Sequence, residues 1–379
     1  MSRRFLSLMV VIVCFVFVLS LGISTGVNFG EAAKKASLTK IESSDKKAVI
    51  KCPKGTFVVK ENQLIENEVP TIATEVYFSQ TYNYEPYANH TFASDIFKIS
   101  VLDKVYRLSE QGELTLTYSK SISKVVADRL SVWYSCYGND KPDFKNCTPK
   151  ENCLGGYVNA GKNTVTVPFQ IKGIDAYYAV FLDQREPAFK DDWSYSYVMP
   201  LWSREIMDTV NQNIYEEIKR REFAFMMVRG LGLPVVEEDI NDENRTFWDV
   251  DSDFKFIETA ARYGIINGFP NKDDKPLFKP DSPLTREQAA VIIARVANLK
   301  LPTDVDKVQK DLEKIFPVDG ENISPWAAPA VLAVYKAKFM EGDKINEQGK
   351  VTTFRPDGKL KRSEAAKITY LLLKKLKKI

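Results

Sequence analysis

Three short stretches in the C-terminal half carry one pattern: KRREFA at residues 219–224, TREQAA at residues 285–290 and KRSEAA at residues 361–366. Each has an arginine in second position, a glutamate or glutamine two residues later, a small or apolar pair, and then an apolar run. This order is typical of the first turn of an amphipathic helix. Because one unit of this size cannot bury its own apolar face, we expect the three units to pack against one another.

The sequence around these cores also recurs, although the arginines Arg220, Arg286 and Arg362 are separated unevenly, by 66 and 76 residues. The second unit has, in order, Phe247 to Val250, the apolar stretch Ile257 to Ile266, Asn267 to Pro270 and Phe278 to Pro280. The third unit has, in the same order, Phe316 to Asp319, Trp326 to Tyr335, Met340 to Gly342 and Phe354 to Pro356. Each unit therefore predicts a helix, a glycine-containing turn, a short Phe-x-Pro segment and a second helix.

This order of features resembles the S-layer homology family. The resemblance covers about half of the chain, from about Phe189 onward, and implies a compact, mainly α spindle of three motifs with pseudo-threefold symmetry. We expect the motifs at residues 188–234, 246–301 and 315–377. The first is degenerate, because no Gly-aromatic turn and no Phe-x-Pro segment lie between Val210 and Arg220.

The family binds a secondary cell-wall polysaccharide whose sugars carry acidic pyruvate ketals, so the resemblance implies the same partner here. A helix start presents unpaired N–H groups and the positive end of the helix dipole, and an arginine adds a charged donor fork. The alternative is that the arginines pair with glutamates of their own or adjacent units. The polysaccharide-binding residues implied by the resemblance are Arg220, Arg286, Arg362, Thr285, Gln288, Glu222, Glu364, Gly268, Gly342 and Trp326.

Several of these residues also have a structural interpretation. Thr285 and Gln288 predict a capping box, whereas the lysines at the equivalent positions of the other two units cannot accept a backbone N–H. Gly268 and Gly342 follow apolar helices, where a left-handed cap is expected. The ring of Trp326 could stack on a sugar or fill the small core between helices.

Between about residues 46 and 187 the pattern changes from helical to alternating. Six segments predict strands: Thr56 to Lys60, Asp95 to Leu102, Glu113 to Tyr118, Leu130 to Cys136, Thr164 to Phe169 and Ala176 to Asp183. Residues 155–167 predict a hairpin. Several short strands at this spacing favour an immunoglobulin-like β-sandwich. The aromatic cluster Tyr77, Phe78, Tyr82, Tyr84, Tyr87 and Phe92 could form a sugar-stacking face, but packing on the sandwich is favoured.

The N-terminus predicts export. Residues 1–32 begin with a short basic segment, continue with an apolar run and end in small residues, which is typical of a cleaved signal peptide. A retained membrane anchor is the alternative, since the apolar run is nearly long enough to span a bilayer. Residues 33–45 are rich in Lys and Ser and predict a mobile leader. The net charge of +3 does not favour nucleic acid as a partner.

Apart from Cys14 in the predicted signal peptide, four cysteines remain, and an even set in an exported chain favours disulfides. We expect Cys147 to pair with Cys153 and Cys52 with Cys136, although four cysteines allow three pairings. The spacing does not favour a metal site. The single histidine, His90, is expected at the surface and has no nucleophile signature beside it.

The sequence therefore predicts a cell-surface protein of a Gram-positive-type bacterium, held on the wall by S-layer homology motifs and displaying a β-sandwich. The mechanism is adsorption, without catalysis, cofactor or metal, and several grooves would add avidity. Other S-layer proteins are a further candidate partner. In one alternative the β-sandwich binds carbohydrate or acts as an adhesin, and in another it is a wall-active glycoside hydrolase with paired carboxylates.

Overall fold

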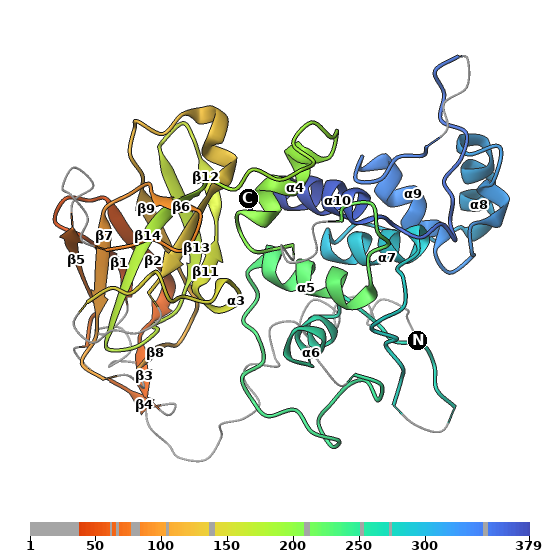
Figure 1. Ribbon diagram of the computed structural model, residues 1–379. Helices are drawn as coiled ribbons and strands as arrows, with labels where there is room; N and C mark the ends of the chain where they lie inside the picture. Colours follow the sequence, from red (N-terminus) through yellow and green to blue (C-terminus); the bar gives the residue numbers. More distant parts are fainter. Residues whose placement is uncertain are drawn as a thin grey trace.

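The computed structural model describes residues 38–60, 63–65, 68–76, 84–103, 106–135, 141–207, 213–250, 254–272, 275–343 and 348–379. An N-terminal β-region, residues 38–187, lies beside a C-terminal helical region, residues 188–379 (Figure 1). Residues 1–32, the predicted signal peptide, lie outside the described residues. Within those described, no helix has the length and apolar character needed to cross a membrane.

The β-region contains two main sheets. One has the strand order β1-β2-β9-β13-β12, and the other has β11-β10-β14-β7-β5 with β6 also paired to β14. A third, small sheet has the order β4-β3-β8. The strands are β1 (Leu38–Glu42), β2 (Ala48–Thr56), β3 (Val58–Lys60), β4 (Gln63–Leu64), β5 (Thr71–Val76), β6 (His90–Phe92), β7 (Ile96–Ser100), β8 (Arg107–Leu108), β9 (Gly112–Thr117), β10 (Leu130–Tyr134), β11 (Cys153–Gly155), β12 (Tyr157–Asn159), β13 (Thr164–Phe169) and β14 (Asp175–Asp183).

The two main sheets share one hydrophobic core. Alternate residues of β9 and β13, such as Leu114 and Val165, meet Phe97 of β7 and Val180 of β14 in this core. Strand β14 is central in its sheet and is buried on both faces, because Phe181 and its neighbours contribute to a second core on the outer side. Its sequence is therefore an almost continuous apolar run, unlike the alternating β9 and β13.

Most of the predicted strands are present, and the predicted hairpin is formed by β12 and β13. The leader prediction is wrong for residues 38–42, which form β1 and pair with β2. Its exposed positions carry Lys and Thr and its inward Leu38 is buried, as expected for an edge strand whose polar side chains face solvent.

His90 lies inside the molecule, so the expectation of a surface histidine is wrong. It is 4% exposed and its ring lies 5.2 Å from that of Trp133 and 5.6 Å from that of Tyr87. Burial lowers the pKa of His90, which favours the neutral ring. Of the predicted aromatic cluster, Tyr84, Tyr87 and Phe92 pack against this core, whereas Tyr77, Phe78 and Tyr82 lie outside the described residues.

The cysteines are not paired as predicted. Cys147 and Cys153 are both buried, and no disulfide joins them to each other. The Cys147 thiol donates to the carbonyl of Asp143 at 3.3 Å, while Cys153 lies in β11 beside β10. Burial raises the pKa of the Cys153 thiol to about 12. Cys52 is also free, and its predicted partner Cys136 lies outside the described residues.

The helical region consists of hairpin-like units and one unpredicted helix, α8. The first unit has α4 and α5, the second α6 and α7, and the third α9 and α10. The helices are α4 (Tyr195–Trp202), α5 (Arg220–Leu231), α6 (Phe254–Arg262), α7 (Arg286–Val296), α8 (Val305–Ile315), α9 (Ala328–Lys336) and α10 (Arg362–Lys375). Short helices α3 (Pro149–Asn152), η1 (Lys124–Arg129) and η2 (Gly320–Asn322) complete the fold.

A closed ring of backbone hydrogen bonds joins the three units. The residue two positions before each arginine takes part: Ile218 donates to Leu360, Leu360 to Leu284, and Leu284 to Ile218, at 2.8, 2.9 and 3.0 Å. All three side chains are buried in the core of the helical region. Each helix start is therefore fixed by both of the other units.

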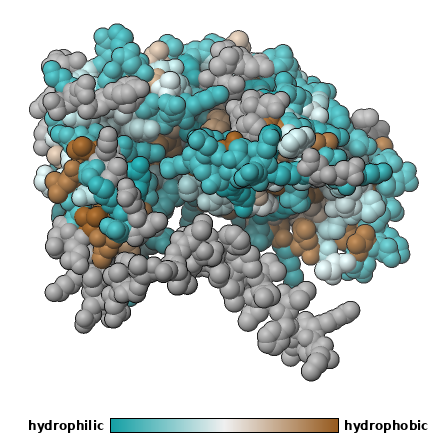
Figure 2. Space-filling view, turned by 90° about the horizontal axis from the view of Figure 1, so that it is seen from below, coloured by the Kyte–Doolittle hydropathy of each residue, from teal (hydrophilic) through white to brown (hydrophobic). Residues whose placement is uncertain are grey.

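The surface is mainly polar. In the view of Figure 2, hydrophilic side chains cover most of the described residues, and hydrophobic side chains gather in small, separate groups. Isolated exposed apolar residues are normal in folded proteins.

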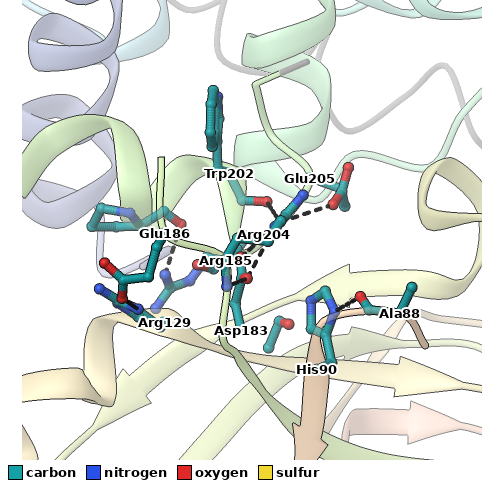
Figure 3. Close-up of polar contacts among 12 residues, drawn as sticks. Ala88, His90, Arg129, Asp183, Arg185, Glu186, Trp202, Arg204 and Glu205 are labelled. Atoms are coloured by element: carbon teal, nitrogen blue, oxygen red, sulfur yellow. Dashed lines mark hydrogen bonds and ion pairs between the residues drawn. The ribbon is translucent and has the colours of Figure 1, made fainter. Parts of the chain in front are cut away.

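The two regions meet through arginines. Arg204, which is 1% exposed, donates to the carbonyls of Gly156 and Asp128 in the β-region, at 2.9 and 2.6 Å. Beside it, Arg185 bridges Asp183 at the end of β14 and Glu205 after α4 (Figure 3). A buried guanidinium with several carbonyl partners holds backbone segments in a fixed arrangement. The junction is therefore an ordered interface.

Candidate polysaccharide site in the helical region

The three predicted arginines occupy equivalent positions and are nearly inaccessible. Arg220, Arg286 and Arg362 are the first residues of α5, α7 and α10 and are 6%, 4% and 2% exposed. The structure brings them into one repeated arrangement, in which each guanidinium contacts the next unit. The three arginine side chains are therefore almost entirely buried.

Arg220 contacts the Phe-x-Pro segment of the second unit. Its Nε donates to the carbonyl of Phe278 at 2.8 Å and its Nη1 to Oε1 of Gln288 at 3.1 Å. The guanidinium carbon lies 4.8 Å from the ring centres of both Phe269 and Phe278. Burial lowers the pKa of Arg220 to about 10, so the group remains a cation at neutral pH.

Arg286 repeats this arrangement one unit further on. Its Nε donates to the carbonyl of Phe354 and its Nη2 to that of Glu341, both at 2.7 Å. The carboxylate of Glu364 lies 3.8 Å from Nη1. Burial lowers the pKa of Arg286, against the opposing charges of nearby carboxylates such as Asp343 and Glu364.

Arg362 closes the cycle by pairing with Glu222 of the first unit. The three partners of the arginines, Gln288, Glu364 and Glu222, therefore occupy the same position of successive units. The glutamates also accept the N–H of the residue before each helix, as Glu222 does from Lys219 at 2.8 Å. This pairing with adjacent units corresponds to the alternative that the sequence left open.

The backbone N–H groups at the helix starts are not open to a ligand. The amide of Arg220 donates to Ser282, that of Arg286 to Gly358 and that of Arg362 to Glu216, at 2.8–3.0 Å. The next amide of each helix likewise donates to a carbonyl of the neighbouring unit. These amides, which the sequence led us to expect at a sugar carboxylate, are therefore occupied by the packing of the units.

Thr285 and Gln288 form the predicted capping box. Oγ1 of Thr285 accepts from the amide of Gln288 at 3.3 Å, and Oε1 of Gln288 accepts from that of Thr285 at 3.4 Å. In the other two units the lysine side chain accepts nothing and only the reverse bond from the glutamate is made. Gln288 thus caps its own helix and also accepts from the arginine of the preceding unit.

Gly268 and Gly342 are needed for close packing, and not for a left-handed backbone as predicted. Neither has a positive φ, whereas Gly264 and Lys338, four residues earlier, have φ of 67° and 60° and end the helices. A Cβ on Gly268 would lie 2.7 Å from the Phe247 ring, and one on Gly342 would overlap the carbonyl of Thr353. These positions thus allow the turn to lie directly against the Phe-x-Pro segment.

Two aspartates link the beginning of a unit to its Phe-x-Pro segment. Asp249 accepts from the amides of Phe278 and Lys279, at 2.6 and 2.8 Å, and Asp319 does the same in the third unit. Lys279 has a φ of 57°, which is uncommon for a residue with a side chain. The paired carboxylate bonds therefore hold an otherwise unfavourable turn.

One cleft combines a motif arginine with an exposed aromatic side chain. It has a volume of about 390 Å³, and Arg286, Gly342 and Glu364 line it together with Trp193 and Tyr197 of the first unit. Trp193 is 55% exposed. Lys338 and Lys367 add positive charge to the wall. Trp193 is not among the residues predicted to bind the polysaccharide, because the degenerate first unit gave no reason to expect its participation.

Trp326, the predicted aromatic ligand, is 58% exposed and is not among the residues that line this cleft. Arg362 and Glu222 line a second cleft beside α5. Within the described part of the chain, no group of three or more His, Cys, Asp or Glu side chains is placed to hold a metal ion.

Comparison with known proteins identifies the helical units. The S-layer homology domain matches residues 246–290 and 318–366, which are the second and third units, and the match does not extend to the first. The chain is a protein with S-layer homology domains. Such domains bind cell-wall polysaccharide and anchor proteins to the wall, and the chain accordingly belongs to the cell surface of a Gram-positive-type bacterium.

Similar curated proteins include enzymes and S-layer proteins. An amylopullulanase of Thermoanaerobacterium thermosulfurigenes is 26% identical over 88% of this chain and 16% of its own length. An endoglucanase of Bacillus sp. (strain KSM-635) is 28% identical over 49% of this chain and 18% of its own length. The S-layer protein sap of Bacillus anthracis is 28% identical over 41% and 16%. The chain thus spans about a sixth of the length of these relatives.

Proposed function

We propose that the chain attaches non-covalently to acidic, pyruvylated-type secondary cell-wall polysaccharide through the cleft that contains Arg286 and Trp193. The supporting observation is an indole, 55% exposed, on the wall of a cleft of about 390 Å³ that also carries Lys338 and Lys367. A flat ring stacks on the apolar face of a sugar, and ammonium groups pair with its carboxylate.

In this proposal the buried arginine and the lysines have different roles. Arg286 holds the backbone carbonyls of Phe354 and Glu341 in place, and its buried charge contributes a positive electrostatic potential to the cleft. Lys338 is exposed and Lys367 is half-buried, so these two groups can reach a ligand. The Lys367 ammonium lies 3.5 Å from the carboxylate of Glu341. Such an ion pair is weak at an exposed site, so the carboxylate of a ligand can compete with Glu341 for the ammonium.

The proposal extends to the architecture of both regions. We propose that the closed ring of Ile218, Leu284 and Leu360 reflects a pseudo-threefold spindle, and that the two packed sheets form an immunoglobulin-like sandwich. We also propose that the β-region is a displayed spacer without catalytic activity, with other S-layer proteins as neighbours. The inward packing of Tyr87 and Phe92 supports a spacer over a sugar-binding face.

Substitution of Trp193 tests the proposed function. We expect Trp193→Ala to weaken binding to purified wall polysaccharide by roughly tenfold, because one stacking contact is lost. Since Trp193 is exposed, the thermal unfolding temperature is expected to stay unchanged. Isothermal titration calorimetry with the purified polymer measures the affinity.

Trp326→Ala is the matched control, because this indole is equally exposed but lies outside the cleft. It is expected to bind like the parent. Loss of affinity in Trp326→Ala with none in Trp193→Ala would place the sugar elsewhere and overturn the proposal.

A further inference from the structure

A second cleft lies where the β-region meets the start of α5. It has a volume of about 260 Å³, and both regions contribute to its walls. Lys150 of α3 comes from the β-region, while Glu217, Phe225 and Arg362 come from the helical region. Of the residues that the structure describes, Lys150 is the one lining residue from the β-region, so the junction of the two regions places its side chain at this cleft.

Lys150 is held against the helical region by two different contacts. Arg229 of α5 donates to the carbonyl of Lys150 at 3.0 Å and to that of Cys153 at 2.8 Å. The Lys150 ammonium lies 5.8 Å from the centre of the Phe225 ring, also on α5. Arg229 of the helical region thus holds the Lys150 backbone, and the contact with the Phe225 ring keeps the Lys150 ammonium beside the cleft wall.

The other cations of this cleft already have carboxylate partners. Arg362 pairs with Glu222, and both Lys219 and Arg221 pair with Asp281, at 3.1 and 2.6 Å. In the described residues, Lys150 takes part in none of the ion pairs. It is therefore the cation of this cleft best able to receive the carboxylate of a ligand.

The remaining walls indicate the class of ligand. Glu216 and Glu217 line the cleft, and their carboxylates can accept hydrogen bonds from hydroxyl groups but repel a second negative charge. The half-buried Phe225 adds an apolar surface. A sugar that carries a single carboxylate satisfies all three features, whereas a polyanion such as a polyphosphate does not.

We propose that this cleft is a second subsite for a carboxylate-bearing sugar of the wall polymer, with Lys150 of the β-region binding the carboxylate. The inference rests on the proposed function and gives the β-region a direct part in anchoring. Two subsites on one chain raise the affinity for a polymer through avidity.

Charge substitutions at Lys150 in the full chain test the subsite. The probes are purified wall polysaccharide carrying pyruvate ketals and the same polymer after mild acid removal of the ketals. We expect Lys150→Ala to weaken binding of the acidic polymer roughly three- to tenfold, as for loss of one charge contact. Lys150→Arg is expected to retain binding, and the de-ketalised polymer is expected to bind parent and Lys150→Ala equally.

Lys145→Ala is the matched control, because Lys145 is an exposed lysine of the same region that does not line the cleft. If the parent itself fails to bind the acidic polymer, the proposed function is overturned and the subsite with it. If the parent binds and Trp193→Ala weakens binding while Lys150→Ala does not, the subsite alone is overturned. Equal losses for both polymers would show that Lys150 does not act on the carboxylate.

Discussion

At the scale of single residues, the recurring arginine links neighbouring units and is largely closed to a ligand. Its position was evident from the sequence, but its partner was not. Arg220 and Glu222 are two residues apart in the chain, yet Arg220 bonds to Gln288 and Glu222 to Arg362. A periodic pattern predicts which residues share a helix face, whereas packing of separate units decides which faces meet.

The burial of Arg286 also changes what its substitution can reveal. An alanine there would leave the carbonyls of Phe354 and Glu341 without their donors, which is costly inside a protein. Loss of wall binding in such a variant would therefore not separate ligand contact from folding. For this reason the exposed Trp193 is the better probe of the cleft.

Gly342→Ala is expected to destabilise the protein by about 3 kcal/mol or more, because the added methyl group would overlap Val351 and the carbonyl of Thr353. Gly161→Ala is the control, since a Cβ there meets only the Asn159 side chain at 3.4 Å. Urea unfolding measures both. A Gly342→Ala variant as stable as the parent would show that the close approach can relax.

At the scale of elements, each S-layer homology unit is held together by contacts between segments far apart in the chain. The sequence showed the aromatic–Asp start and the Phe-x-Pro segment as separate features. The structure joins them, because Asp249 and Asp319 accept the amides of Phe-x-Pro residues 29–36 positions later. Helix starts and strand alternation are local and could be predicted, whereas this link is not visible in any local pattern.

Asp319→Ala is expected to lower the free energy of unfolding by about 2–3 kcal/mol, because two amide bonds to a carboxylate are lost. The strained Arg355, with a φ of 58°, would also lose its support. Asp357→Ala, at an exposed position in the same segment, serves as the control. Chemical denaturation compares the two, and equal stabilities would contradict a role for the Asp319 carboxylate.

At the scale of the whole molecule, the sequence predicted a β-rich region followed by a helical region, but it did not predict the interface between them. The alternating pattern gave β13 with its bounds and β14 within one residue. It missed β1 and β5, edge strands whose exposed polar residues hide the period, and it also missed most of the inner strand β2 and the helix α8. The junction depends on Arg204 bonding to backbone carbonyls, which any sequence can supply, so no residue pattern predicts it.

The junction is expected to depend on pH through Glu205. Burial raises the pKa of Glu205 to about 7 from the usual 4.5, against the opposing charges of Arg185 and Arg229 and with the support of Asp183. Between these values the folded protein holds a proton that the unfolded chain has released. The contribution of Glu205 to stability therefore falls as pH rises from 4.5 to 7 and stays low above that.

Glu205→Gln should consequently be more stable than the parent by about 1–3 kcal/mol at pH 8, with the difference disappearing near pH 4.5. Glu186→Gln, at an exposed position of the same network, is the control (Figure 3). Denaturant unfolding across this pH range checks the sign. A difference that did not change with pH, or that grew toward acid, would contradict the burial argument.

The closed ring of Ile218, Leu284 and Leu360 has a consequence for how the protein reaches its destination. A chain that emerges from the ribosome or the export channel with its N-terminus first delivers Leu360 after Ile218 and Leu284. The ring therefore cannot close before all three units have emerged. Wall attachment through these units would then wait until all three of them have left the export channel. A nonsense mutation before Leu360 is expected to leave this ring open and so to weaken wall binding by the helical region.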